Sequence, residues 1–385
     1  MILFREYRLI RLFRYPVPLR IAVTGTRGKS SVVRLITAVL SGSGLRVLAK
    51  TTGTKPLLIF PDGTEKEILR RGRPSILEGK RFLKTAADLG ANALVGEMMS
   101  IQPETIYVES HQILDPRILV ITNVRRDHME SLGRSNLDIA RSYAAAIPAD
   151  GVLILPEEEH FPIFEKEARR RRTRVIRVPQ DLLERAVGER EVLPATEFKA
   201  NLRLALAAAD FLKIDLQNAW NSLRSVRSDP GSLSVHLIRK KMSCQKLLAV
   251  NAFSVNDPDS TMIVLSRLNL HHPFRDLPWL GILNLRSDRG DRTQQWLEAL
   301  RAGLFPELKK LVLTGGHAVA LRNKLLARFE PSSLQITKIK DPSKMMELVF
   351  GMTEGDTAVI GMGNRRGMGG VMCKHWSTVG ELYDL

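Results

Sequence analysis

The stretch that decides the fold reads Ala-Val-Thr-Gly-Thr-Arg-Gly-Lys-Ser-Ser and occupies residues 22–31. It overlaps a short apolar run at residues 21–23, which predicts a β-strand, and leads into apolar residues at helical spacing over residues 32–40. A strand, a turn containing glycine, and then Lys-Ser at the start of a helix are the layout of a phosphate-binding loop. The backbone N–H groups of such a turn attract an anion, and the helix dipole strengthens this attraction. The stretch therefore predicts that the protein binds a nucleoside triphosphate.

Individual residues of this loop have chemistry that suits phosphate binding. Gly25 and Gly28 let the backbone approach the phosphates closely and adopt positive φ where the turn needs it. Lys29 supplies a mobile positive charge for the β- and γ-phosphates, and Ser30 supplies a hydroxyl for Mg²⁺. The loop is a compact variant, because the longer Gly-x-x-x-x-Gly-Lys-Ser pattern has glycine where Val23 stands. An ordinary strand-to-helix turn is the alternative interpretation.

The composition describes a globular chain with an unbalanced charge. Its 385 residues suffice for two or three domains, and 44% of them are hydrophobic and 26% charged. Two distant cysteines predict a reducing compartment without disulfides, and no apolar run reaches the roughly 20 residues of a membrane-spanning helix. The net charge of +17 predicts a polyanionic partner, for which nucleic acid, anionic lipid and a polyanionic substrate all stay open.

The N-terminal segment mixes bulky apolar side chains with arginines and predicts a helix. On that helix Ile2, Leu9, Leu12 and Phe13 share one face, which Arg5 interrupts. Such a face suits an interfacial helix that lies on an anionic membrane or on an apolar partner. A helix packed on the core of the protein itself explains the pattern equally well, so both interpretations stay open.

Short apolar runs alternate with amphipathic stretches along nearly the whole chain. This rhythm predicts an α/β fold: a P-loop-type, mostly parallel sheet with helices on both faces, followed by a smaller Rossmann-like α/β domain. A Ser-Asp-Pro-Gly-Ser turn at residues 228–232 marks the boundary. The expected organisation is a basic amphipathic segment at residues 1–20, a nucleotide-binding domain at residues 21–229, and a C-terminal domain at residues 230–385. The family resemblance given below implies that the nucleotide is ATP and that the C-terminal domain closes over it.

Polar residues follow the second and third predicted strands, at the sheet edge where ligands of α/β proteins bind. Lys50, Thr51, Thr52 and Thr54 belong to a Lys-Thr-Thr-Gly-Thr-Lys run, which predicts a pocket for a substrate phosphate or carboxylate. Glu97 ends the third strand, where a carboxylate opposite a phosphate loop holds Mg²⁺ directly or through water. A polar turn and a surface glutamate are the alternatives.

The fourth predicted strand is followed by a dense group of functional side chains. Asn123, Asp127 and His128 all lie at this strand end. His128 has the chemistry to bind a metal, orient a carboxylate or contact the γ-phosphate. A single histidine is often structural, but its two polar neighbours favour a role in the site.

The C-terminal half carries further candidates at strand ends. Asn256 precedes an Asp-Pro-Asp-Ser-Thr sequence that is typical of a helix start. Arg286, Asp288 and Arg289 belong to a charged run at residues 284–293, in which arginines would clamp phosphates and aspartates would hold ribose or metal. A solvated charged loop is the alternative for this run.

Taken together, these motifs resemble a known family of ligases. Residues 23–30, Glu97 and the Asn-Val-Arg-Arg-Asp-His sequence at residues 123–128 are similar to the ATP-binding set of Mur ligases and folylpolyglutamate synthases. The similarity is closer to the ligase subunits of poly-γ-glutamate synthases, of the PgsB/CapB type, and it covers nearly the whole chain. Its most specific part is the Asp-Arg-Thr-Gln-Gln sequence at residues 291–295.

The resemblance implies an ATP-dependent carboxylate–amine ligase that polymerises glutamate through γ-linkages, with ATP and Mg²⁺ as cofactors. ATP would phosphorylate a side-chain carboxylate to an acyl phosphate, an amine would attack it, and ADP and phosphate would leave. Catalytic roles are implied for Lys29, Glu97, His128 and Arg286, and Mg²⁺ coordination for Ser30, Glu97 and His128. The implied ATP-binding residues are Gly25, Thr26, Arg27, Gly28, Lys29, Ser30, Ser31, Asn123, Asn256, Arg286, Asp288 and Arg289.

Two features depart from the Mur ligase pattern. Residues 140–147 contain no lysine, where many Mur ligases carry a modified one, so Arg141 or a simpler one-metal site would substitute. No large domain precedes the phosphate loop, which argues against a UDP-linked peptidoglycan precursor as the substrate.

The resemblance also implies partners and a location. The expected partners are glutamate, the growing polymer and small membrane subunits of a polymer synthase, with residues 1–15 in peripheral contact with the inner face of the plasma membrane. A cytoplasmic protein without nucleic acid is expected, and a homo-oligomer stays open. One alternative is a folate- or cofactor-type γ-glutamyl ligase. Another is a nucleic-acid-binding ATPase, although the sequence lacks the interleaved aromatic residues that such proteins use.

Overall fold

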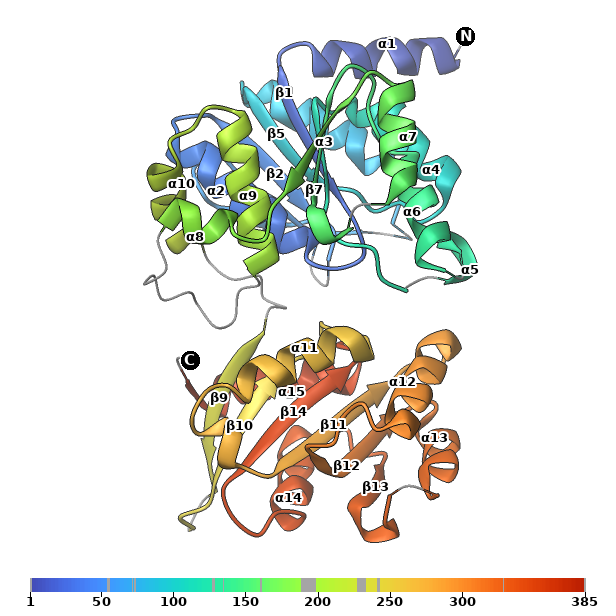
Figure 1. The fold of residues 1–385 in the computed structure, drawn as a ribbon, viewed down its shortest axis with the longest axis vertical. Coiled ribbons are helices and arrows are strands. Elements are labelled where there is room, and N and C mark those ends of the chain that lie inside the picture. Colours follow the sequence, from blue (N-terminus) through green and yellow to red (C-terminus); the bar gives the residue numbers. More distant parts are fainter. Residues whose placement is uncertain are drawn as a thin grey trace. The chain divides into compact units, whose positions relative to one another are not determined.

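A computed structural model gives the fold of the protein (Figure 1). The contacts divide the chain into two compact units, called unit 1 (Met1–Leu193 with Glu197–Pro230) and unit 2 (Pro194–Thr196 with Gly231–Leu385). The residues that the structure describes are 2–53, 56–70, 72, 74–126, 129–133, 135–159, 161–187, 199–226, 233–240, 243–327 and 329–383.

Unit 1 is built on an eight-stranded sheet with the order β4-β3-β2-β5-β1-β6-β7-β8. The six strands β2, β5, β1, β6, β7 and β8, which are neighbours in this order, run parallel. β3 and β4 form an antiparallel edge next to β2. The parallel strands are apolar on both sides because helices cover both faces of the sheet. The strands are β1 (Leu19–Thr24), β2 (Val47–Thr51), β3 (Leu57–Ile59), β4 (Glu65–Glu67), β5 (Ala93–Glu97), β6 (Ile118–Ile121), β7 (Val152–Pro156) and β8 (Arg174–Val178).

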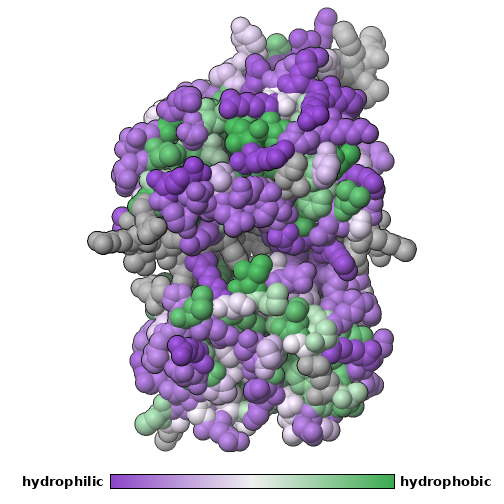
Figure 2. All heavy atoms as spheres, viewed as in Figure 1, coloured by the Kyte–Doolittle hydropathy of each residue, from purple (hydrophilic) through white to green (hydrophobic). Residues whose placement is uncertain are grey.

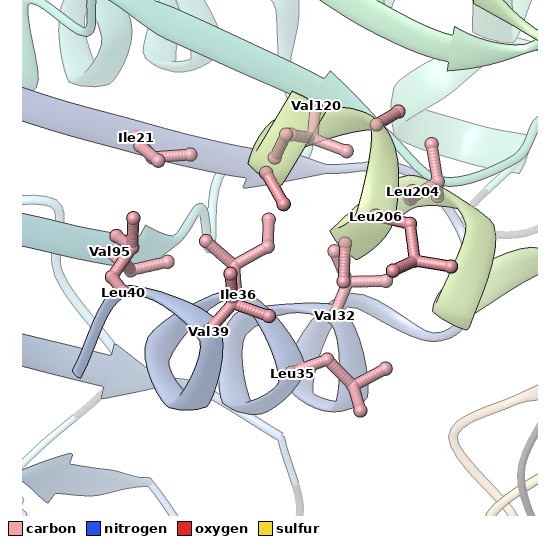
Figure 3. Packing of buried hydrophobic residues seen from close by; sticks show 14 of the residues in the cluster. Ile21, Val32, Leu35, Ile36, Val39, Leu40, Val95, Val120, Leu204 and Leu206 are labelled. Atoms are coloured by element: carbon pink, nitrogen blue, oxygen red, sulfur yellow. The ribbon is translucent and has the colours of Figure 1, made fainter. Parts of the chain in front are cut away.

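Alternate residues of each strand belong to two different cores. Ile21 of β1 packs with residues of α2 and α9 on one face, as the close view of that core shows (Figure 3), and Val23 and residues of α10 belong to the same core. Ala22 points the other way and packs with α3, η1, α6 and α7. The helices of unit 1 are α1 (Ile2–Arg14), α2 (Lys29–Gly42), α3 (Glu78–Asp88), α4 (Pro103–Tyr107), the π-helix η1 (Val108–Leu114), α5 (Met129–Leu132), α6 (Asn136–Ala144), the short η2 (Glu157–Glu159), α7 (Pro162–Arg170), α8 (Leu182–Val187), α9 (Lys199–Phe211) and α10 (Leu216–Arg224).

Helix α1 packs against unit 1 along an edge that differs from the expected face. Ile10 and Phe13 lie against the core beside α3, and Arg14 is buried and pairs with Asp115 at 3.0 Å. Leu12, which was expected to share the buried face, is 65% exposed. The interpretation of a helix packed on its own protein is therefore correct for this edge. Within the described part of the chain, no helix has the length and apolar character needed to cross a membrane.

Unit 2 contains a seven-stranded sheet with the order β13-β12-β11-β14-β10-β9-β15. The five strands from β13 to β10 are parallel, and β9 and β15 add an antiparallel edge. The strands are β9 (Ser234–Arg239), β10 (Lys246–Asn251), β11 (Trp279–Leu285), β12 (Leu308–Gly315), β13 (Leu334–Thr337), β14 (Thr357–Gly363) and β15 (Glu381–Leu382).

Two aromatic rings anchor one core of unit 2, where Phe253 and Trp376 stack with their ring centroids 5.7 Å apart. Aspartates start two of the helices, because Asp257 accepts from the Ser260 N–H at 2.9 Å and Asp341 from the Ser343 N–H at 2.8 Å. The helices are α11 (Pro258–Leu268), η3 (Phe274–Asp276), α12 (Gly290–Ala302), α13 (Ala318–Leu325), η4 (Pro331–Ser333), α14 (Pro342–Gly351) and α15 (Met368–Val379). On the face that Figure 2 shows, hydrophilic residues dominate, as on most globular surfaces.

Candidate functional site

The loop between β1 and α2 has a backbone that only glycine fits at two positions. Gly25 has φ 125° and Gly28 has φ 78°. A Cβ atom would lie 2.2 Å from Thr122 Oγ1 at the first position and 2.6 Å from Asn201 Oδ1 at the second. Gly28 is also the N-cap of α2, and no side chain caps that helix end in the described structure. Because glycine has no side chain, no N-cap side chain competes with a bound anion at the start of α2.

We expect Gly28→Ala to destabilise unit 1 and to weaken nucleotide binding, since it adds both backbone strain and a steric clash. Gly63→Ala is a matched control, because Gly63 has φ 81° and open space around its Cβ position. The strain alone should cost about 1 kcal/mol in each variant. Thermal unfolding and calorimetric titration with ATP will separate the two effects. Equal unfolding midpoints and unchanged ATP affinity in Gly28→Ala would contradict the proposed fit of the loop.

Two residues that follow β6 hold the backbone of the β1–α2 loop by hydrogen bonds. Thr122 Oγ1 donates to the Arg27 carbonyl at 2.6 Å. The Asn123 amide group donates to the same carbonyl at 3.1 Å and accepts from the Arg27 N–H at 3.0 Å. Asn123, a predicted ATP-binding residue, thus uses its side chain to position the loop backbone.

The first turn of α2 and the ends of β2 and β5 meet at the carboxylate of Glu97, which is only 4% exposed. The Ser30 hydroxyl donates to Glu97 Oε2 at 2.7 Å, and the Thr52 N–H donates to the same oxygen at 2.7 Å. Lys29 lies over the loop and donates from Nζ to the Gly25 carbonyl at 2.8 Å. The predicted phosphate-binding and metal-binding residues of β1, β2 and β5 are therefore adjacent.

A cavity of about 260 Å³ opens at this point. Lys29, Thr52 and Glu97 all contribute to its wall. Asp127, His128 and Thr54 lie outside the described residues. The described residues that line it are Thr24, Gly25, Thr26, Arg27, Lys29, Thr52, Gly53, Arg70, Pro74, Glu97, Met98, Met99, Ser100, Ile101, Leu132 and Tyr143.

The donor set fits Mg²⁺ bound mainly through water and phosphate oxygens. Within the described ranges, no group of three carboxylate, histidine or cysteine side chains gathers in metal-binding geometry. Ser30 and Glu97 supply one hydroxyl and one carboxylate, and Mg²⁺ in nucleotide sites commonly takes one or two protein ligands and keeps several waters. The buried, hydrogen-bonded pair is compatible with a single ion of this kind.

Lys50 and Thr51 are placed differently from Thr52. Lys50 is 3% exposed, does not belong to the cavity wall, and lies with Nζ 3.6 Å from Glu78 Oε2. Burial lowers the pKa of Lys50, although the charges of Glu109 and Glu78 oppose that shift. Thr51 is fully buried. Of the described residues in the predicted substrate pocket, Thr52 alone lines the cavity.

Sequence reasoning missed two residues of this region and placed a third, Arg141, wrongly. Arg70 and Tyr143 line the cavity, and the Tyr143 hydroxyl lies 3.3 Å from Thr26 Oγ1. Arg141, the expected substitute for a modified lysine, instead pairs with Asp138 at 2.9 Å with its side chain 58% exposed.

Glu109 shapes the loop after β5. It is 2% exposed and accepts from the Ser100 N–H at 3.0 Å and the Met99 N–H at 3.2 Å. Burial raises the pKa of Glu109, although these hydrogen bonds and the charge of Lys50 act in the opposite direction.

The candidates of unit 2 gather after β11 and before α11. Arg286 donates from Nε to Asp288 Oδ1 at 2.8 Å, and this hydrogen bond lowers the pKa of Asp288. Arg289 pairs with Asp291 at 3.4 Å. Asn256 has φ 77°, and its side-chain Oδ1 is buried without a donor among the described residues. These groups lie beyond the carboxyl ends of β10 and β11, where α/β sheets bind ligands.

Two family models together match most of the chain. The Mur ligase middle domain matches residues 23–208, and the poly-γ-glutamate synthase CapB C-terminal domain matches residues 238–378. The capsule biosynthesis protein CapB of Bacillus anthracis is 33% identical over 73% of this chain, but the match spans only 60% of that relative. The PGA synthase CapB of Bacillus subtilis (strain 168) is 30% identical over 91% of this chain and 88% of its own length.

Solved structures confirm the predicted fold class. Folylpolyglutamate synthase of Mycobacterium tuberculosis, solved with ADP and AMPPCP, aligns with a TM-score of 0.67 at 17% identity over 96% of this chain and 94% of its own. MurF from Acinetobacter baumannii aligns with a TM-score of 0.65 at 15% identity over 96% of this chain and 79% of its own. With the sequence matches, these findings confirm the expected family: the chain belongs to the CapB family of poly-γ-glutamate synthases and carries a Mur ligase middle domain.

Proposed function

We propose that the protein is an ATP-dependent ligase that joins glutamate units through their side-chain carboxylates into a γ-linked polymer. One observation carries the proposal. Lys29 and Glu97 line one cavity at the start of α2, whose N-cap is Gly28, and Ser30 donates a hydrogen bond to Glu97, in a chain of the CapB family. The two CapB relatives are named for capsule biosynthesis and for PGA synthesis, and the folylpolyglutamate synthase neighbour binds ADP and AMPPCP.

Bound ATP would supply the phosphoryl group that turns a carboxylate into an acyl phosphate, which an amine can attack. Lys29 and the N–H groups at the start of α2 would bind the phosphates and stabilise the charge that develops on the transferred group. Ser30 and Glu97 would hold Mg²⁺ beside them. The amine that attacks loses a proton as the amide forms, and the carboxyl oxygen leaves with the phosphate.

Residues outside this cavity complete the proposed set. Arg286, Asp288 and Arg289 would contact the nucleotide from unit 2, and the buried acceptor of Asn256 suits a hydroxyl or amino donor of that ligand. His128 is proposed to support the metal or phosphate region. The net charge of +17 would help to retain a polyanionic product near the enzyme.

The test of the proposed function is incubation of the purified chain with ATP, Mg²⁺ and glutamate. We expect ADP release that depends on glutamate, together with γ-linked oligomers in the mass spectrum. Turnover with a folate-like acceptor but not with glutamate would favour the folate-type alternative. ATP hydrolysis stimulated only by single-stranded nucleic acid would favour a nucleic-acid-binding ATPase. The absence of all three activities would contradict the proposal.

We also propose that α1 brings the protein to the inner face of a membrane, where small membrane subunits would join it. The side chains of Tyr7, Leu12 and Tyr15 are 47%, 65% and 91% exposed, and Arg8 and Arg11 accompany them on the helix. Apolar and aromatic groups beside arginines suit an anionic lipid surface.

We expect the full chain to sediment with vesicles that contain anionic lipid and to release them at high salt. Leu12→Asp should weaken this binding, because it puts a negative charge at the lipid-facing side of α1. Leu270→Asp is the matched control, since Leu270 is 82% exposed and belongs to unit 2. Equal sedimentation of both variants and the wild type would contradict a membrane role for α1.

A further inference from the structure

Arg70 is a cavity residue that the proposed phosphate and metal chemistry does not use. It follows β4, and its side chain is 19% exposed at the cavity wall. Its Nε and Nη2 groups donate to the two oxygens of Glu78 at 2.8 and 3.0 Å. Among the described residues, none accepts a hydrogen bond from Nη1 of Arg70. The guanidinium is thus fixed on one side and keeps donors for a ligand on the other.

A buried lysine, Lys50, holds the carboxylate of Glu78 that pairs with Arg70. Lys50 Nζ lies 3.6 Å from the Glu78 oxygen that Arg70 Nη2 also contacts. Burial acts to raise the pKa of Glu78, but the hydrogen bond from Arg70 and the charge of Lys50 outweigh it and lower that pKa. Glu78 therefore stays ionised between two cations, and a two-point ion pair of this kind restricts the guanidinium to one orientation.

The sheet order separates Arg70 from the phosphate loop. Lys50 is part of β2, the phosphate loop follows β1, and β5 with Glu97 at its end lies between these strands. Neighbouring strands are about 4.8 Å apart, so the two ends are separated by roughly 10 Å. Arg70 is linked through Glu78 to Lys50 of β2, whereas Lys29 follows β1, the strand on the other side of β5. It is therefore placed to meet the group that receives the phosphoryl group.

We propose that Arg70 binds the α-carboxylate of the glutamate unit whose γ-carboxylate is activated, and so directs the reaction to the γ-position. The inference rests on the proposed function. Glutamate carries two carboxylates of similar chemistry, so an enzyme that makes γ-linkages has to hold the α-carboxylate away from the transferred phosphoryl group. A guanidinium matches a carboxylate in shape and charge better than an ammonium does. Lys50 and Glu78 act through Arg70 and are positioning residues.

The test compares glutamate with 4-aminobutyrate, which keeps the carboxylate to be activated and lacks the α-carboxylate. Hydroxylamine replaces the acceptor amine, so that each activated carboxylate is trapped as a hydroxamate whose position chromatography identifies. In the wild type we expect glutamate γ-hydroxamate and a kcat/KM for glutamate about 10- to 100-fold above that for 4-aminobutyrate, the range of a charged hydrogen bond. In Arg70→Gln the KM for glutamate should rise by about that factor. The kcat/KM for 4-aminobutyrate and the KM for ATP should stay nearly unchanged.

Arg177→Gln is the matched control, because Arg177 also pairs with a glutamate of unit 1, Glu165 at 2.8 Å, but does not line the cavity. Arg70→Lys should restore part of the discrimination, since it keeps the positive charge.

Three results would overturn the inference alone: a wild type that uses both compounds equally, an Arg70→Gln variant that loses turnover of both equally, or one whose only change is a higher KM for ATP. A wild type that forms no hydroxamate from either compound would instead overturn the proposed function.

Discussion

Lys29→Met should reduce glutamate-dependent ADP release by about 1,000-fold or more, which is the largest single effect that we expect. The ammonium group of Lys29 is the mobile cation of the phosphate-binding loop, and Lys29 lines the cavity. Removal of this charge leaves the negative charge of the transferred phosphoryl group without its closest protein counterion. A coupled assay for ADP measures the loss directly.

The fold should survive this substitution, because Lys29 Nζ bonds to the carbonyl groups of Gly25 and Thr26 in its own loop. Lys84→Met is the matched control, since Lys84 forms an exposed ion pair with Asp88 at 2.5 Å. We expect the thermal unfolding of both variants to resemble that of the wild type. Activity of Lys29→Met within about tenfold of the wild type would be incompatible with the proposed site.

Glu97→Gln should have the second largest effect and should act through the metal. The amide keeps an oxygen for the Ser30 hydroxyl and the Thr52 N–H, so the start of α2 and the ends of β2 and β5 stay connected. It removes the negative charge that Mg²⁺ requires. We expect the Mg²⁺ concentration for half-maximal activity to rise by about 10- to 100-fold, and part of the lost rate to return at high Mg²⁺.

A titration of activity against Mg²⁺ at saturating ATP measures this shift. Glu165→Gln serves as the control, since Glu165 pairs with Arg177 at 2.8 Å and does not line the cavity. A variant whose Mg²⁺ dependence matches that of the wild type would mean that Glu97 only ties the strand ends together.

The sequence predicts most of the parallel sheets because their strands are strongly apolar and regularly spaced between helical patterns. The predicted strand at residues 93–97 matches β5 in full, and the strand ends that carry Ser30 and Glu97 meet as expected. The sequence did not predict the antiparallel strands at the edges of the two sheets. β4 consists of exposed Glu-Lys-Glu and has no apolar alternation, and β9 and β15 pair antiparallel at an edge that a parallel α/β rhythm does not predict.

The cavity wall was less predictable than the loop. The sequence predicted that Lys50 binds a substrate. Lys50 instead lies in β2, whose residues are all buried, and its ammonium group pairs with Glu78. Arg70 comes from a loop with no strand-end signal, and Tyr143 comes from the last turn of α6. Only the tertiary arrangement brings these two residues to the wall of the cavity, so no local pattern could have identified them.

The start of α2 has a consequence for the lifetime of the protein. The N-cap of this helix is a glycine, which has no side chain, and the first turn contains no acidic residue. An anion that binds there contributes to folding by mass action, by about 2.7 kcal/mol when its free concentration is a hundred times its dissociation constant. Resistance to proteolysis would then follow the supply of nucleotide, and starved cells would degrade the enzyme sooner than well-fed ones.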